Sequence, residues 1–206
     1  MAREAGRLTL VLASGNPGKL REIGAILAPL SIDVVAQSTL GITEAEEPHV
    51  TFLENALAKA RHASRAAKLP ALADDSGLCV DALGGAPGVD SAYYAGRGGN
   101  REQRDARNNE KLLSALTSAR AAHYRCVMVF VREPDDPEPL VAEGVWRGEI
   151  ARAPRGSNGF GYDPLFFLKE FNKTAAELDP DHKNRVSHRG IALQKLLGLL
   201  RESGLR

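Results

Sequence analysis

The stretch RLTLVLASGNPGKL, residues 7–20, carries the signatures of a buried strand, a turn and a helix start. Residues 7–13 are mostly apolar, as in a short buried strand, and residues 14–19 supply the Ser, Gly, Asn and Pro of a turn. Asn16 can cap a helix, and Pro17 suits the first helical position. A second strand is predicted at residues 32–36. A strand, a helix and a strand at the start of the chain predict an α/β protein.

The rest of the chain continues this alternation. Further elements are predicted from capping residues, apolar periodicity and β-branched content: a helix from a Thr51–Glu54 capping box to Leu69, a strand over 71–73, a helix over 101–116, a strand over 124–131, a returning strand through Trp146, a strand over 165–168 and a helix over 187–201. The predicted hairpin around residues 133–139 makes the sheet mixed. Without a repeat or a linker, residues 1–206 are expected to form one domain.

Composition argues against nucleic acid and membrane partners. With 27 basic and 26 acidic side chains the net charge is +1, so no global field attracts a nucleic-acid backbone. No apolar run approaches the roughly 20 residues that span a bilayer, and the charged N-terminus is unlike an export signal. Cys79 and Cys126 lack disulfide or metal spacing, which favours reduced thiols over a disulfide. We therefore expect a cytoplasmic protein.

The turn from Ser14 to Lys19 has the ingredients of an anion site, because free N–H groups, a positive helix end and a lysine come together. An ordinary glycine turn is the alternative. The spacing of Gly15 and Gly18 differs from that of a Walker A loop. We expect the Lys19 side chain to be exposed there and to bind phosphate.

Two adjacent aspartates, Asp74 and Asp75, end the predicted strand at 71–73. Ligands of α/β proteins bind at this carboxyl edge, and carboxylates with substrate phosphates suit Mg²⁺. Asp75 could orient a water or act as its base, and Ser76 could donate to a phosphate oxygen. Oxygen ligands are also offered by the loop residues Glu44, Glu46 and Glu47, whose alternative is a solvated acidic loop. The histidines lack zinc-site spacing.

The segment from Phe160 to Pro164 offers an aromatic platform, a flexible glycine and a carboxylate. A nucleobase can stack on such a platform, although core aromatic residues are the alternative. Near the start of the last predicted helix, Lys183, His188 and Arg189 supply donors for an anion or a carbonyl oxygen, with a basic helix cap as the alternative.

These pieces occur in a fixed order along the chain: Ser14-Gly15-Asn16-x-x-Lys19, Thr51-Phe52-x-x-Asn55-Ala56-x-x-Lys59-Ala60, Asp74-Asp75-Ser76-Gly77-Leu78, Gly85-x-Pro87-Gly88, Phe160-Gly161-Tyr162-Asp163-Pro164 and Ser187-His188-Arg189. The ordered set, from about Leu8 to Leu200, resembles the inosine triphosphatase family, also called dITP/XTP pyrophosphatase. The resemblance implies an elongated two-lobed α/β fold, with a central mixed sheet flanked by helices and an active-site cleft between the lobes. It also implies a homodimer and Mg²⁺-dependent hydrolysis of ITP, dITP and XTP to the monophosphate and pyrophosphate.

The resemblance assigns three groups of residues. The residues assigned to phosphate binding are Ser14, Gly15, Asn16, Pro17, Gly18, Lys19 and Lys59. Mg²⁺ is assigned to Glu47 and Asp75, with Glu46 the alternative to Glu47, and Asp75 is also the proton acceptor. The nucleotide pocket is assigned to Ser76, Phe160, Gly161, Tyr162, Asp163, Lys183, His188 and Arg189. The chain departs from the family pattern at His49, Asp90 and Tyr93, and the missing arginine at 93 leaves Tyr93 out of the site.

Two other functions stay open. One is a nucleotide house-cleaning pyrophosphatase with a different base preference, and the other is a nucleotide sensor that binds without hydrolysis. The paired aspartates favour an enzyme, because a sensor needs no carboxylate to activate water.

Overall fold

The computed structural model describes residues 8–27 and 32–204 of the chain. The first residue of the predicted opening strand, Arg7, lies outside this part. The helices are α1 (Pro17–Leu27), α2 (Phe52–Ala67), α3 (Arg101–Ala115), α4 (Pro180–Val186) and α5 (His188–Glu202). The strands are β1 (Leu8–Leu12), β2 (Ile32–Ala36), β3 (Ala71–Val80), β4 (Ala121–Val131), β5 (Leu140–Ile150), β6 (Phe166–Leu168) and β7 (Lys173–Thr174).

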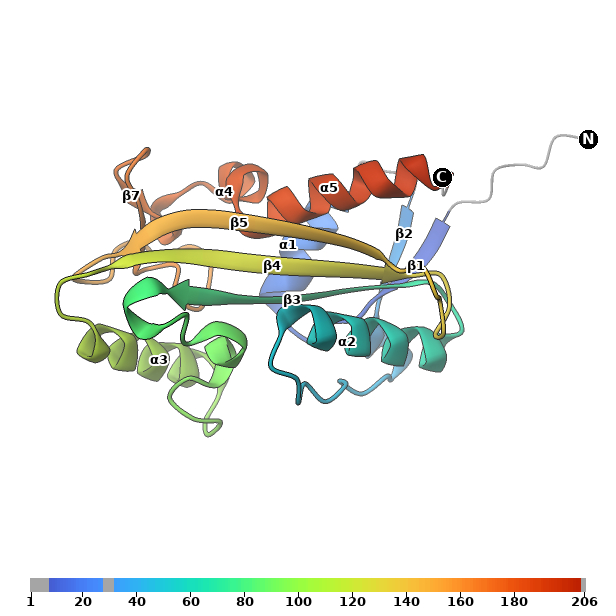
Figure 1. The fold of residues 1–206 in the computed structure, drawn as a ribbon, viewed down its shortest axis with the longest axis horizontal. Coiled ribbons are helices and arrows are strands. Elements are labelled where there is room, and N and C mark those ends of the chain that lie inside the picture. Colours follow the sequence, from blue (N-terminus) through green and yellow to red (C-terminus); the bar gives the residue numbers. More distant parts are fainter. Residues whose placement is uncertain (1–7, 28–31, 205–206) are drawn as a thin grey trace, which may run out of the picture. The chain divides into compact units, whose positions relative to one another are not determined.

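The described strands form one sheet in the order β2-β1-β3-β4-β5-β6-β7 (Figure 1). β1 runs parallel to β2 and β3, whereas β6 runs antiparallel to β5 and β7. This arrangement confirms the predicted α/β class and the mixed sheet.

The chain divides into two compact units. Unit 1 contains the described residues up to Asp75, the segment Cys126–Gly144 and the described residues from Arg189 on. Unit 2 contains Ser76–Arg125 and Val145–His188. Strands β3, β4 and β5 each contribute residues to both units. The cleft between lobes and the single domain over residues 1–206 stay predictions.

In unit 1, β3 and the second half of β1 are buried on both faces of the sheet, and successive residues of each strand point to alternate faces. Leu10, Leu12 and Leu72 share one apolar cluster with helices α1 and α5. Val11 and Ala73 belong to a second cluster, with the alanines of α2. Because neighbouring residues of a strand point to opposite faces, this pattern fixes the direction of every side chain in the unit 1 part of β3.

In unit 2 the core joins α3, β5 and β6 through large side chains such as Leu112, Trp146 and Phe166. Tyr124 and Trp146 each lie against the Phe166 ring, with centroids 4.7 and 5.2 Å apart. In the described part of the chain, no helix has both the length and the apolar content to cross a membrane.

Two strands are longer than predicted: β4 begins at Ala121 and not at residue 124, and β3 extends well beyond residue 73. β3 runs from Ala71 to Val80, so Asp74 and Asp75 lie inside the strand and not at its end. Asp, Ser and Gly are depleted in strands, which is why the sequence suggested a turn there. Both aspartates form buried ion pairs, and Gly77 has no Cβ to meet the Gly88 carbonyl or the Ser91 hydroxyl.

Two helix predictions also need correction. α2 begins after Thr51 as expected, but it ends at Ala67, with Lys68 in the left-handed region. The Thr51 hydroxyl accepts the Glu54 N–H and donates to the Glu54 carboxylate, 3.2 and 2.6 Å away. The short helix α4, capped by the Asp179 side chain, was not predicted.

Candidate active site

The turn from Ser14 to Lys19 links β1 to α1 as the sequence predicted. The Asn16 side chain accepts the N–H groups of Gly18 and Lys19, at 2.9 and 3.2 Å, so it caps the helix that Pro17 begins. Gly15 lies beside the Glu44 carboxylate, which a Cβ at this position would meet. A side chain at position 15 would therefore require the exposed Glu44 side chain to move.

Asp75 points to the face of β3 that α2 covers. Lys59, on α2, places its ammonium 3.2 Å from Asp75 Oδ1 and 3.0 Å from Glu47 Oε2. One buried cation therefore serves two carboxylates, and Glu47 of the predicted pair Glu46 and Glu47 makes this contact. Three predicted site residues are thereby brought together.

Asn55 is a member of this cluster that was quoted in a motif but not assigned to the site. Its amide donates to Asp75 Oδ2 at 3.3 Å and to the His49 carbonyl at 3.1 Å, and it accepts the His49 N–H at 3.1 Å. Asn55 thus connects the strand to the acidic loop. The signal for it was its spacing of four from Lys59, which puts both side chains on one helix face.

The shared cation leaves the cluster short of positive charge. Burial raises the pKa of the Asp75 carboxyl above its ordinary value, although Lys59 and Lys19 oppose the shift. Burial alone would lower the pKa of the Lys59 ammonium, but Asp75 and Glu47 outweigh it and raise that pKa. The lysine is therefore charged, while the ionised aspartate is not fully compensated.

Asp74 points to the opposite face, toward α1 and α5. Its Oδ2 lies 2.9 Å from Lys19 Nζ and 3.5 Å from Arg189 Nε. Arg189 also pairs with Glu22 of α1, and burial, which would lower the pKa of the guanidinium, is outweighed by these two carboxylates. The prediction that Lys19 is exposed was wrong, because its side chain is 13% exposed and ion-paired. A role of Arg189 in contacting a base stays a prediction.

The predicted base platform lies in unit 2, and its two aromatic rings differ. Phe160 is half-buried, whereas Tyr162 is buried in the core and donates its hydroxyl hydrogen to the Ser91 carbonyl at 2.9 Å. Asp163 Oδ2 accepts the Phe160 N–H at 2.8 Å and the ammonium of Lys183 at 2.7 Å. Phe160 is therefore the ring of this pair that can present a face to a ligand.

The remaining predicted pocket residues are less accessible. Lys183 belongs to α4, while Ser187 and His188 are buried at the junction of α4 and α5. The His188 ring stacks on Tyr124, with centroids 4.6 Å apart. Ser76 is half-buried in β3. Contacts within unit 1 thus join Lys59 to Glu47 and Asp75, and contacts within unit 2 join Phe160 and Lys183 through Asp163. That the assigned residues of both units form one site stays a prediction.

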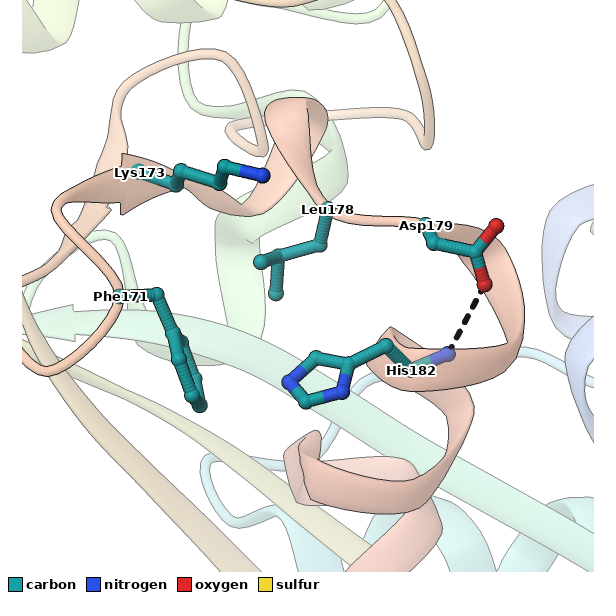
Figure 2. A pocket seen from close by; sticks show the side chains of 5 residues that line it. All are labelled: Phe171, Lys173, Leu178, Asp179 and His182. Carbon is teal, nitrogen blue, oxygen red and sulfur yellow. Dashed lines mark hydrogen bonds between the residues drawn. The ribbon is translucent and has the colours of Figure 1, made fainter.

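A hollow of about 380 Å³ in unit 2 is separate from the predicted site residues. Figure 2 shows its lining, in which the rings of Phe171 and His182 meet edge to face at 4.9 Å. The other lining residues are Lys173, Leu178 and Asp179. None of the assigned site residues lines it.

Within the described residues, no group of three or more His, Cys, Asp or Glu side chains is arranged to hold a metal ion. The carboxylates of Glu47 and Asp75 nevertheless converge on one cation, the Lys59 ammonium. Mg²⁺ is commonly held by one or two carboxylates together with substrate phosphates. The donor set therefore fits Mg²⁺ that binds with a phosphate ligand.

Comparison with known proteins agrees with the predicted family. A model of the Ham1 family matches residues 10–199. The dITP/XTP pyrophosphatase of Burkholderia pseudomallei is 60% identical over 201 residues, which cover 97% of this chain and 96% of that protein. The dITP/XTP pyrophosphatase of Ralstonia nicotianae is 61% identical over 194 residues, covering 93% and 96%.

Solved structures give the same result. A HAM1 protein from Coxiella burnetii has a TM-score of 0.85 and 48% identity, covering 95% of this chain and 99% of that chain. The Staphylococcus aureus Ham1 protein has a TM-score of 0.82 and 38% identity over the same shares. The motifs, the fold and these matches together show that the chain belongs to the Ham1 family, as the resemblance predicted.

Proposed function

We propose that this chain is a Mg²⁺-dependent nucleoside-triphosphate pyrophosphohydrolase that removes ITP, dITP and XTP from the nucleotide pool. The observation that carries the proposal is the cluster in which Glu47 and Asp75 share the Lys59 ammonium. The relatives named dITP/XTP pyrophosphatase support the substrate class. The products are the nucleoside monophosphate and pyrophosphate.

The charges of the cluster match the needs of this reaction. Asp75 and Glu47 carry two negative charges against one on Lys59, so the cluster favours a further cation. Bound there, Mg²⁺ would neutralise phosphate charge and favour departure of pyrophosphate. Lys59 and Lys19 would stabilise the same developing charge. The Asp75 carboxylate would accept the proton of the water that attacks the α-phosphorus.

The base preference follows from donors near Phe160. The Lys183 ammonium lies 5.1 Å from the centre of the Phe160 ring, and an ammonium can only donate hydrogen bonds. Hypoxanthine and xanthine present a 6-keto acceptor and an N1 donor, whereas adenine presents the opposite pair, a 6-amino donor and an N1 acceptor. An unpaired buried polar group costs about 1–3 kcal/mol, so two mismatches give discrimination on the order of 10².

The test is kcat/KM for ITP, XTP, ATP and GTP with Mg²⁺. We expect ITP and XTP to be cleaved on the order of 10²-fold more efficiently than ATP. Equal efficiency on ATP and ITP would contradict the base preference and favour a pyrophosphatase with other substrates. Nucleotide binding without turnover would instead favour a sensor.

We also propose that the protein is a cytoplasmic homodimer. The family resemblance supports the dimer, and light scattering should give twice the mass of one chain. Cys79 and Cys126 are buried and form no disulfide, and burial raises the pKa of the Cys79 thiol, which suits unreactive cysteines in a reducing compartment.

A further inference from the structure

Phe160 lies in a segment with little regular structure of its own. Residues 157–165 are bends and turns, and Gly159 and Gly161 have φ angles of 78° and 63°. Glycine gives such a loop conformational freedom, so the direction of the Phe160 ring depends on the groups that hold the loop. Asp163 accepts the Phe160 N–H, and two further groups that hold the loop lie on α3, which the proposed function does not use.

Three side chains at intervals of four residues form a row along α3: Arg101, Asp105 and Asn109. Residues four apart in a helix lie on the same face. The residues that follow each of them, Glu102, Ala106 and Glu110, are exposed. The row therefore faces the rest of unit 2, and a neighbouring face of the helix is exposed to solvent.

Asp105 and Asn109 together hold both polar groups of Gly161. The Gly161 N–H donates to Asp105 Oδ2 at 2.9 Å, and Asn109 Nδ2 donates to the Gly161 carbonyl at 2.9 Å. The N–H belongs to the peptide plane shared with Phe160 and the carbonyl to the plane shared with Tyr162. Two consecutive peptide planes are thus fixed, and with them the directions of both aromatic side chains.

The orientation of the Asn109 amide is itself determined by its surroundings. Its Nδ2 also donates to the Asp105 carbonyl at 2.8 Å, so both partners of the NH₂ group are carbonyl oxygens. A carboxylate in place of the Asn109 amide would put its acceptor oxygens against these two carbonyl oxygens, which are also acceptors. The site therefore requires a donor.

Arg101 completes the row at the ring itself. Its guanidinium carbon lies 4.6 Å from the centre of the Phe160 ring, and its Nε lies 3.8 Å from Asp105 Oδ2. A guanidinium at this distance from an aromatic ring is attracted to it. The same aspartate thus contacts both the backbone that carries Phe160 and the cation that contacts its ring.

We propose that Arg101, Asp105 and Asn109 are positioning residues that set the Phe160 platform for the purine base. The inference rests on the proposed function, since the base is that of the proposed substrate. It adds an element to the site that acts on base binding and leaves the phosphate residues of unit 1 untouched.

The experiment compares KM and kcat for ITP in the full-length protein with Mg²⁺. Asp105→Ala and Asn109→Ala should each raise KM about tenfold with kcat nearly unchanged. Asn109→Asp should raise KM further than Asn109→Ala does. Asp105→Asn keeps an acceptor oxygen, so its KM should be close to that of the parent. The matched controls Glu102→Ala and Glu110→Ala, on the exposed side of α3, should leave both constants at the parent values.

Inorganic tripolyphosphate separates base positioning from a general structural effect. It has no base, so its inhibition constant should be the same in the parent and in the row variants. A parallel rise in that constant, or a lower melting temperature with an unchanged KM for ITP, would overturn the proposal. Absence of ITP hydrolysis in the parent would instead remove the proposed function, so the two failures are distinguishable.

Discussion

Asp74 and Asp75 are neighbours in β3, yet they contact different cations on opposite faces of the strand. Asp74 is fully buried between the cations of Lys19 and Arg189 on the α1 and α5 face. Asp75, on the α2 face, shares the Lys59 cation with Glu47. The alternation of a strand separates two carboxylates that look like a pair in the sequence. The two cations beside Asp74 suit a structural role, whereas the one cation that Asp75 shares with a second carboxylate suits the proposed metal ligand.

The largest expected effect is on catalysis by Asp75. Asp75→Asn should lower kcat on ITP by about 10²- to 10⁴-fold, because an amide cannot accept the proton of the attacking water. Circular dichroism should show an intact fold. The control Asp135→Asn, at a carboxylate that is 89% exposed, should keep the parent rate. A folded Asp75→Asn variant with near-parent turnover would remove Asp75 from catalysis.

Asp74 should dominate stability instead. Asp74→Ala leaves the buried cations of Lys19 and Arg189 without their shared partner, so the free energy of unfolding should fall by about 3–5 kcal/mol. Urea unfolding of Asp74→Ala and Asp75→Asn measures the contrast. Asp75→Asn should not be less stable than the parent at neutral pH, because burial disfavours the ionised carboxylate. An equal loss of unfolding free energy in both variants would contradict the distinction between the two faces of β3.

The raised pKa of Asp75 gives a third test. In the metal-free protein it should lie above the ordinary aspartate value of about 3.9. Lys59→Met removes an opposing cation, so the pKa should rise by about 1–3 further units. Carbon-detected NMR of the carboxyl measures both values, with the exposed Lys68→Met as control. Because the folded pKa is raised, stability should fall as pH rises from the unfolded pKa to the folded pKa.

The smallest expected effect distinguishes the two loop glutamates. Glu47→Gln should raise the Mg²⁺ concentration for half-maximal rate by at least about tenfold, because a neutral amide is a weaker Mg²⁺ ligand than a carboxylate and loss of even an outer-shell partner commonly costs that much. Glu46→Gln should leave it unchanged, because Glu47 is the residue that reaches Lys59. The reverse outcome would assign the metal to Glu46. Magnesium titrations of ITP hydrolysis decide the matter.

The fold was predictable where local patterns and tertiary packing agree. Asn16 and Pro17 predicted where α1 begins, and the alanines of α2 predicted which side of that helix packs on the sheet. The length of β3 was not predictable, since its Asp, Ser and Gly residues disfavour strands and only distant partners compensate them. Local reasoning has no access to such partners.

The sequence predicted candidate site residues, but it could not predict the contacts among them. Motifs named Lys59 and Asp75, whereas the ion pair of Lys19 with Asp74 and the contact of Asn55 with Asp75 depend on which face of β3 each side chain takes. The row on α3 that holds Gly161 carried no signal in the sequence, because a hydrogen bond to a backbone group leaves no pattern in residue types.

The most direct test of the proposed reaction is to hydrolyse ITP with Mg²⁺ in ¹⁸O-labelled water and identify the products. If Asp75 directs water to the α-phosphorus, the products are inosine monophosphate and pyrophosphate in equal amounts, with the label on the monophosphate. Inosine diphosphate with labelled orthophosphate, or label on pyrophosphate, would contradict the proposed position of the attacking water.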